Sequence, residues 1–222
     1  MRILALAALA LLIPQESKAA KARFRSMEEK LLKAKTLKIA YAVVPAAGQA
    51  TYKGEIYLGE ENRCRFVLET NYLKSTIRTL ITSDGATVEI VTDGIPGNPF
   101  KPPPTMGANL RTRLARAGAF AAHEAARFET SAKQDPAESL PVEGFKLGAK
   151  EKVGEREAQV LEFRIPGRVD TFVTVWIDIE TQLPLKSTAK LNQGVTQITY
   201  ETFLADEVLD PNLFKAPPKK QP

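Results

Sequence analysis

Few side chains in this sequence have the chemistry that catalysis requires. His123 is the only histidine and Cys64 the only cysteine, and the acidic residues are scattered along the chain. Catalysis by a histidine needs a neighbouring group that orients the ring, and a structural zinc site needs four ligands, mostly nitrogen or sulfur. One histidine and one cysteine cannot form either a histidine-based catalytic site or a zinc site. We therefore expect a binding protein rather than an enzyme, with no metal and no other cofactor.

The positions of these two residues also favour structural roles. His123 lies in a helical pattern over residues 106 to 131, well outside its apolar stripe, so we expect it at the surface. A hydrolase that depends on His123 is therefore the weakest of the three functions that we consider; the other two, both binding functions, are given below. Cys64 lies between Arg63 and Arg65 at the start of a predicted strand, and we interpret it as a small buried side chain rather than a reactive thiol.

The first 19 residues have the order of a secretory signal peptide. A positive charge at Arg2 precedes an unbroken apolar run from Ile3 to Ile13, and small residues follow where cleavage is expected, after Ala19 or Ala20. The alternative, a buried N-terminal helix, would normally show a polar face. The apolar run has eleven residues, whereas a membrane-spanning helix needs about 20. We therefore predict an exported protein without a stable membrane span.

Residues 20 to 222 are predicted to form a single domain. They contain 29 basic and 25 acidic side chains, and the two signs are interspersed. This mild excess of positive charge argues against nucleic acid as a partner, although it is compatible with weak attraction to anionic lipids. Cys64 is too far from the cleavage point to carry a lipid anchor, and a single cysteine excludes an internal disulfide.

Periodicity predicts mainly β structure with two helices. An amphipathic helix is expected over residues 22 to 37, before the first strand. Strands rich in β-branched and aromatic residues are expected over Lys38–Val44, Thr51–Leu58, Arg65–Thr70, Thr76–Thr82, Thr87–Val91, Phe145–Val153, Glu157–Ile165, Thr171–Ile179, Leu185–Leu191 and Val195–Phe203. Turn-forming residues separate most of them, which predicts consecutive antiparallel pairs.

The strand pattern is interrupted in mid-chain. The proline-rich stretch from 94 to 104 is not expected to continue a sheet ladder, and the helical pattern over 106 to 131 follows it. The narrow apolar stripe of that helix consists of Leu110, Leu114, Ala117, Ala121, Ala125 and Phe128. The fold class predicted from these features is α+β, mainly β: a strongly curved antiparallel sheet whose inner face is covered by helices.

Several motifs, in this order, resemble those of LolA-type outer-membrane lipoprotein carriers. They are Lys53–Leu58, Arg63–Phe66, Leu80–Val88, Val175–Asp178, Leu183–Lys186, Thr196–Phe203 and Leu209–Phe214. The order matches over most of residues 24 to 218. The resemblance implies an incomplete β-barrel whose concave apolar side, lidded by helices, holds the acyl chains of lipoproteins or lipids. It also implies that the exported protein is periplasmic, with partners among the lipoprotein machinery of the inner and outer membranes.

Strand alternation nominates the residues that would bind lipid. The inward residues of three strands, together with the lid residues of the second helix, are Ile56, Leu58, Phe66, Leu68, Val173, Val175, Ile177, Leu110, Leu114 and Phe128. Each could equally be ordinary core packing, because a curled sheet under helices needs the same stripes to fold. Trp176 is expected on the opposite sheet face, and Arg63 or Arg65 at the rim. The second hypothesis is a sensory or scaffolding module that binds a protein partner through the same sheet.

Overall fold

A computed structural model describes residues 17–46, 50–128, 138, 140–167, 170–191 and 194–216. Most of the predicted leader, the last residues of the second helical pattern and the C-terminal tail from residue 217 lie outside this part of the chain. The predicted cleavage point falls inside the described residues, since Ala19 and Ala20 belong to the first helix.

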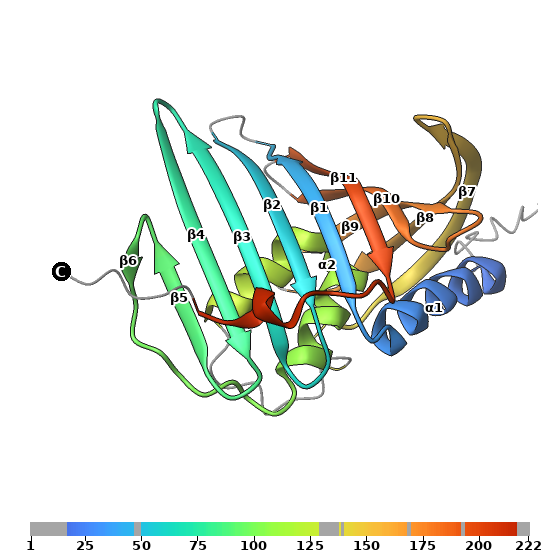
Figure 1. Ribbon diagram of the computed structural model, residues 1–222. Helices are drawn as coiled ribbons and strands as arrows, with labels where there is room; N and C mark the ends of the chain where they lie inside the picture. The colour runs from blue at the N-terminus through green and yellow to red at the C-terminus, as the bar shows by residue number, and fades with distance from the viewer. Residues whose placement is uncertain are drawn as a thin grey trace, which may run out of the picture.

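The described residues form one antiparallel sheet of eleven strands, in the order β6-β5-β4-β3-β2-β1-β11-β10-β9-β8-β7 (Figure 1). The strands are β1 (Leu37–Val44), β2 (Ala50–Leu58), β3 (Arg63–Tyr72), β4 (Ser75–Asp84), β5 (Val88–Thr92), β6 (Ile95–Pro96), β7 (Glu143–Val153), β8 (Arg156–Ile165), β9 (Thr171–Asp178), β10 (Pro184–Leu191) and β11 (Gly194–Ala205). The sheet is open, with β6 and β7 as its edges. The predicted fold class, a curved sheet with covering helices, is confirmed.

Alternation gives the sheet one buried face. In β1, Leu37, Ile39, Tyr41 and Val43 are all buried, while the residues between them are more exposed. Buried residues of β1 are aligned with apolar residues of both neighbouring strands, as Ile39 is with Ile56 and Phe203. The inner face is therefore continuous across the strands, and both helices pack on it.

Helix α1 (Lys18–Lys33) starts and ends four residues earlier than the sequence pattern predicted. Its first turn is capped by Ser17, whose Oγ accepts a hydrogen bond from the Ala20 N–H at 3.2 Å. It ends before Leu37 because that residue already pairs with Leu58 in the sheet. Phe24 packs between the rings of Phe145 and Phe163, at centroid distances of 5.0 and 4.9 Å, which fixes α1 over β7 and β8.

Helix α2 (Met106–Phe128) is kinked rather than straight. Gly118 has φ 84° and ψ 179°, a conformation that glycine adopts readily and other residues avoid. The kink shifts the phase of the helix, so the predicted stripe is wrong at Ala117 and Ala121, on either side of Gly118, although Ala125 is buried as predicted. Ala117 and Ala121 are only partly buried, whereas Ala119 and Ala122 face the core.

Two arginines of α2 that do not belong to the predicted apolar stripe, Arg111 and Arg116, are buried. The Arg111 guanidinium donates to the carbonyl oxygens of Ala34, at 3.2 Å, and Gly59, at 2.9 Å, so it ties the end of α1 to the β2–β3 turn. Burial lowers the pKa of Arg111. The Nε of Arg116 lies 2.6 Å from the Glu28 carboxylate and joins the two helices. Charge at these positions is compatible with burial because each guanidinium has fixed acceptors.

The proline-rich stretch does continue the sheet, contrary to the prediction. Ile95 and Pro96 form β6 and pair with β5. A proline is tolerated there because β6 is an edge strand: no further strand lies beside it that would need a hydrogen bond from a backbone N–H. The short helix η1 (Pro211–Phe214), which the sequence pattern did not indicate, lies near β3 and β4 and buries Phe214.

Candidate functional site

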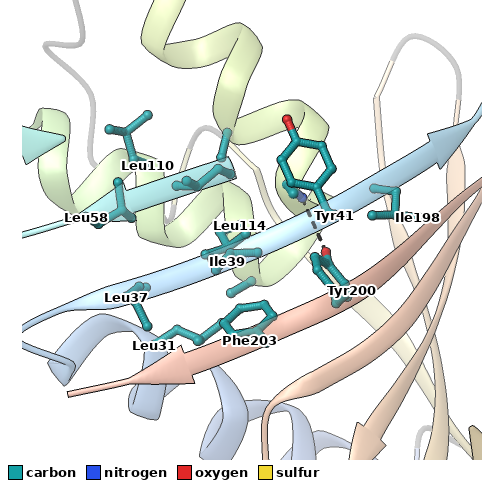
Figure 2. Packing of buried hydrophobic residues seen from close by; sticks show 14 of the residues in the cluster. Leu31, Leu37, Ile39, Tyr41, Leu58, Leu110, Leu114, Ile198, Tyr200 and Phe203 are labelled. Atoms are coloured by element: carbon teal, nitrogen blue, oxygen red, sulfur yellow. Dashed lines mark hydrogen bonds between the residues drawn. The ribbon is translucent and has the colours of Figure 1, made fainter. Parts of the chain in front are cut away.

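The residues nominated as lipid-binding gather in one place. Nine of the ten belong to a single buried cluster between the sheet and the helices. They are Ile56, Leu58, Phe66, Leu68, Leu110, Leu114, Val173, Val175 and Ile177. The side chain of Phe128 lies outside the described part of the chain. Figure 2 shows Leu110 and Leu114 of α2 close to Leu58 and Ile39 of the sheet. The strands and α2 thus form one apolar surface.

Helix α2 meets this surface largely through alanine. Ala115, Ala119, Ala122, Ala125 and Ala126 are all buried, and all belong to the cluster. A buried alanine makes far fewer dispersion contacts than a buried leucine, so an alanine-lined interface is held less tightly than a leucine-lined one. We therefore expect that separating the second half of α2 from the sheet costs less free energy than separating its first half.

Two tyrosines place hydroxyl groups in this apolar region. Tyr200 Oη accepts a hydrogen bond from the Ala119 N–H at 3.3 Å, next to the kink of α2. Tyr41 is only 2% exposed, and its Oη has no hydrogen-bond partner among the described residues. Burial raises the pKa of Tyr41, so the hydroxyl stays protonated. Its ring lies against Gly54, where a Cβ would be 2.6 Å from Tyr41 Cζ, so only glycine fits there.

His123 is buried, contrary to the prediction of a surface residue. Its exposed fraction is 0%, and its ring lies 5.9 Å from that of Phe66, edge to face. The Nδ1 atom is 3.6 Å from Glu124 Oε1. The error follows from the kink at Gly118, because the expected position of His123 assumed one straight helix from residue 106.

Cys64 has the structural role that was predicted. It is 1% exposed, and burial raises the pKa of its thiol to about 12, although the nearby Arg111 acts in the opposite direction. A buried thiol with a raised pKa stays protonated at neutral pH and is a poor nucleophile. Within the described residues, no group of three histidine, cysteine or acidic side chains is placed to hold a metal ion.

An open hollow lies where β10 and β11 separate. The two strands pair from Lys186–Thr199 to Leu191–Gly194, and beyond this point Leu185 and Tyr200 diverge. The hollow has a volume of about 650 Å³, and Lys30 of α1 lines it together with both strands. Its apolar walls include Leu183, Leu185, Tyr200 and Phe203, and the charged residues Arg156, Glu180, Glu201 and Asp206 also line it. In Figure 1 the end of β11 lies close to α1. A volume of this size is typical of small-molecule sites.

The sequence prediction did not include the residues of this hollow. The ladders are irregular beside the hollow, at Leu185 where β10 pairs with β9 and at Glu201 where β11 pairs with β1. Pro184 was the available signal, since a proline cannot donate to the ladder and therefore weakens pairing at the start of β10. Tyr200 and Phe203 belong to the same buried cluster as the predicted lipid-binding residues. The hollow thus opens onto the apolar inner face.

The outer face of the sheet carries a second hollow of about 840 Å³, between β7 and β10. Its walls include Phe172, Thr174 and Lys190, together with Glu162 and Arg164, and it touches one predicted lipid-binding residue, Val173. Trp176 also belongs to this outer face, as predicted. Its Nε1–H donates to Glu151 Oε2 at 2.7 Å, and Lys186 Nζ lies 4.4 Å from its ring centroid. The tryptophan therefore packs among charged side chains, away from the apolar core.

Searches by sequence found no matching family model and no matching curated protein. The fold, in contrast, matches solved structures. The match to MucB has a TM-score of 0.52 at 15% identity and covers 91% of this chain and 64% of that one. LprF from Mycobacterium bovis gives 0.54 at 11% identity, covering 90% and 99% of the two chains. An uncharacterized conserved protein from Thermus thermophilus gives 0.50 at 12% identity, covering 92% and 98%.

These structures confirm the fold that the sequence resemblance implied. The chain spans less than two thirds of the MucB chain, and nearly all of the other two. At such low identity the agreement concerns the path of the chain, and function has to be argued from the site. Within the described residues, no helix combines the length and apolar character needed to cross a membrane.

Proposed function

Starting from the LolA-like fold that the chain shares with MucB and LprF, we propose that it is an extracytoplasmic carrier of acyl chains. The cargo would be the acyl part of a lipoprotein or a lipid, held between the inner face of the sheet and α2. The leader predicted in the first 19 residues would direct the chain to the periplasm. Binding would rest on burial of apolar surface alone, without covalent chemistry.

The observation that carries the proposal is the continuous apolar inner face with an open hollow at its margin. Nine predicted residues contribute to this face, and the hollow of about 650 Å³ opens onto it through Tyr200 and Phe203. Alanines along α2 would let the helix move away from the sheet, so that acyl chains replace its contacts. The Tyr41 hydroxyl, which has no partner among the described residues, would then donate to a carbonyl oxygen of the cargo.

A fluorescent acyl probe tests this proposal with a pair of variants on one helix. Ala122 is fully buried against the sheet and Ala108 is exposed. Ala122→Leu fills the space into which the cargo would bind, and we expect it to lower probe affinity at least about tenfold, the effect of removing room for two or more methylene groups. Ala108→Leu should leave the affinity unchanged. Circular dichroism and thermal unfolding show whether both variants remain folded.

The same preparation distinguishes a carrier from a protein-binding module. Mass spectrometry of the purified mature protein should detect bound lipid, and the delipidated protein should take up the probe. A protein that neither co-purifies with lipid nor binds the probe is not a carrier. Recovery of one defined membrane regulator in a pull-down, together with no probe uptake, would instead support the sensory or scaffolding role.

A further inference from the structure

The turn between β3 and β4 presents an aliphatic side chain to solvent at a conformational cost. Tyr72 pairs with Ser75, so Leu73 and Lys74 are the two turn residues. Leu73 has φ 53° and is 83% exposed. An L-residue with a branched side chain is strained at this φ, and tight two-residue turns favour glycine, asparagine or aspartate there. Leucine therefore serves neither the turn nor the core, which points to a role outside the fold.

Other exposed apolar residues lie at the same end of the sheet. Tyr72 and Ile77 flank the turn, and both are exposed. Because β5 pairs with β4 only from Thr79 to Ser83, the hairpin extends beyond β5, as Figure 1 shows. The ends of neighbouring strands at this edge add three exposed residues. We call the whole set the apolar end: Tyr72, Leu73, Ile77, Val44, Phe172 and Val195.

The topology explains why these residues share one edge. The last residues of β1 pair with the first residues of β11, as Val44 does with Gln197. Val195 is aligned with Lys190, and Lys190 in turn with Phe172. Val44, Phe172 and Val195 thus lie at the strand ends nearest the β3–β4 turn. Exposed hydrophobic residues that gather at one end of a protein mark an interaction surface.

Charge and shape indicate which partner fits this surface. Lys74 and Lys190 are exposed at the same edge, beside the apolar residues, and Lys53 is exposed three residues into β2. A projecting turn with one aliphatic side chain, a neighbouring tyrosine and lysines around it suits the boundary between acyl chains and anionic headgroups. We propose that the apolar end docks the protein on a lipid bilayer that contains anionic lipids. This inference concerns where the protein docks, and it stands independently of the cargo.

Sedimentation with vesicles tests the proposal. The mature protein should bind vesicles of phosphatidylcholine with phosphatidylglycerol, and bind pure phosphatidylcholine vesicles more weakly. Leu73→Asn removes the inserting side chain, so we expect at least about a tenfold lower partition coefficient. Asparagine tolerates positive φ, so the same variant should raise the melting temperature by about 2 °C or more. Lys74→Gln should weaken binding only to the anionic vesicles, by about fivefold.

Val208→Asn is the matched control, because Val208 is 99% exposed and follows β11 at the opposite end of the sheet. It should leave vesicle binding unchanged. If the wild-type protein stays in the supernatant with both kinds of vesicle, or if Leu73→Asn and Val208→Asn reduce binding equally, the docking surface is refuted. Leu73→Asn should also retain acyl-probe uptake, so loss of docking and failure of the carrier function are separate outcomes.

Discussion

Tyr41 and Tyr200 place two hydroxyl groups under α2 in different circumstances. The Tyr200 hydroxyl accepts the Ala119 N–H, whereas the Tyr41 hydroxyl is buried without a partner among the described residues. Removing a satisfied hydroxyl costs about 1 kcal/mol, but removing an unsatisfied one costs nothing or stabilises. Tyr200→Phe should therefore lower the free energy of unfolding by about 1 kcal/mol. Tyr41→Phe should leave it unchanged or raise it, as measured by urea denaturation.

The same pair connects stability to the proposed function. If the Tyr41 hydroxyl donates to a carbonyl oxygen of the cargo, Tyr41→Phe should weaken acyl-probe binding even though the protein is at least as stable. A variant with unchanged probe affinity would show that the hydroxyl does not contact the cargo. Stability losses in Tyr41→Phe as large as those in Tyr200→Phe would mean that a protein group does pair with Tyr41.

At the scale of elements, the kink at Gly118 determines which face of α2 is buried. A Cβ at this position would lie 2.7 Å from Ile198 Cδ1, and φ is 84°. Gly118→Ala should therefore destabilise the protein by about 3 kcal/mol, through steric overlap added to backbone strain. Gly144 has φ 68° with no atom close to the added Cβ, so Gly144→Ala reports the cost of strain alone, about 1 kcal/mol. Equal losses in the two variants would show that the contact with Ile198 is unimportant.

The elements that the sequence predicted well are those with short-range signals. The long strands followed alternation and turn residues closely, as β8 and β9 show, because a residue on the wrong face of a half-buried sheet is costly. Trp176 was placed correctly by the same rule, and Cys64 by the tendency of a free cysteine to be buried. His123 was misplaced because one glycine in left-handed conformation changed the phase of a helix, and glycine alone does not reveal whether that conformation is used.

The candidate site was predicted in part for a related reason. Alternation indicates which side chains face inward, and the nine described residues do form one buried surface. The hollow between β10 and β11 depends instead on where paired strands separate, as they do at Leu185 and Tyr200. Such a separation follows from sheet twist and bulges across several strands, and neither Leu185 nor Tyr200 carries a local signal for it. Pro184 was the nearest indication.

The whole molecule should lose stability in acid through two carboxylates that shape turns. Asp84 accepts backbone N–H groups from Thr87 and Ala86, which lower its pKa. Burial opposes ionisation of Asp178, but hydrogen bonds from Thr181 and the charge of Arg156 outweigh it, so the pKa of Asp178 is also lowered. A carboxylate with a lowered folded-state pKa stabilises the fold above its unfolded pKa, about 4, and this contribution disappears as pH falls through the folded value.

Asp178→Asn should therefore cost about 2 kcal/mol at pH 7, because its oxygen serves several charge-assisted hydrogen bonds at the β9–β10 turn. The difference from the wild type should shrink as the pH is lowered below about 4, where the wild-type carboxyl also becomes neutral. Glu29→Gln is the control, since the Glu29–Lys33 pair is exposed and contributes little to folding. Unfolding curves of the wild type, Asp178→Asn and Glu29→Gln should be measured between about pH 2 and pH 7, which covers the range in which carboxylates titrate. A loss in Asp178→Asn that stays constant across this range would mean that the negative charge of Asp178 does not stabilise the domain.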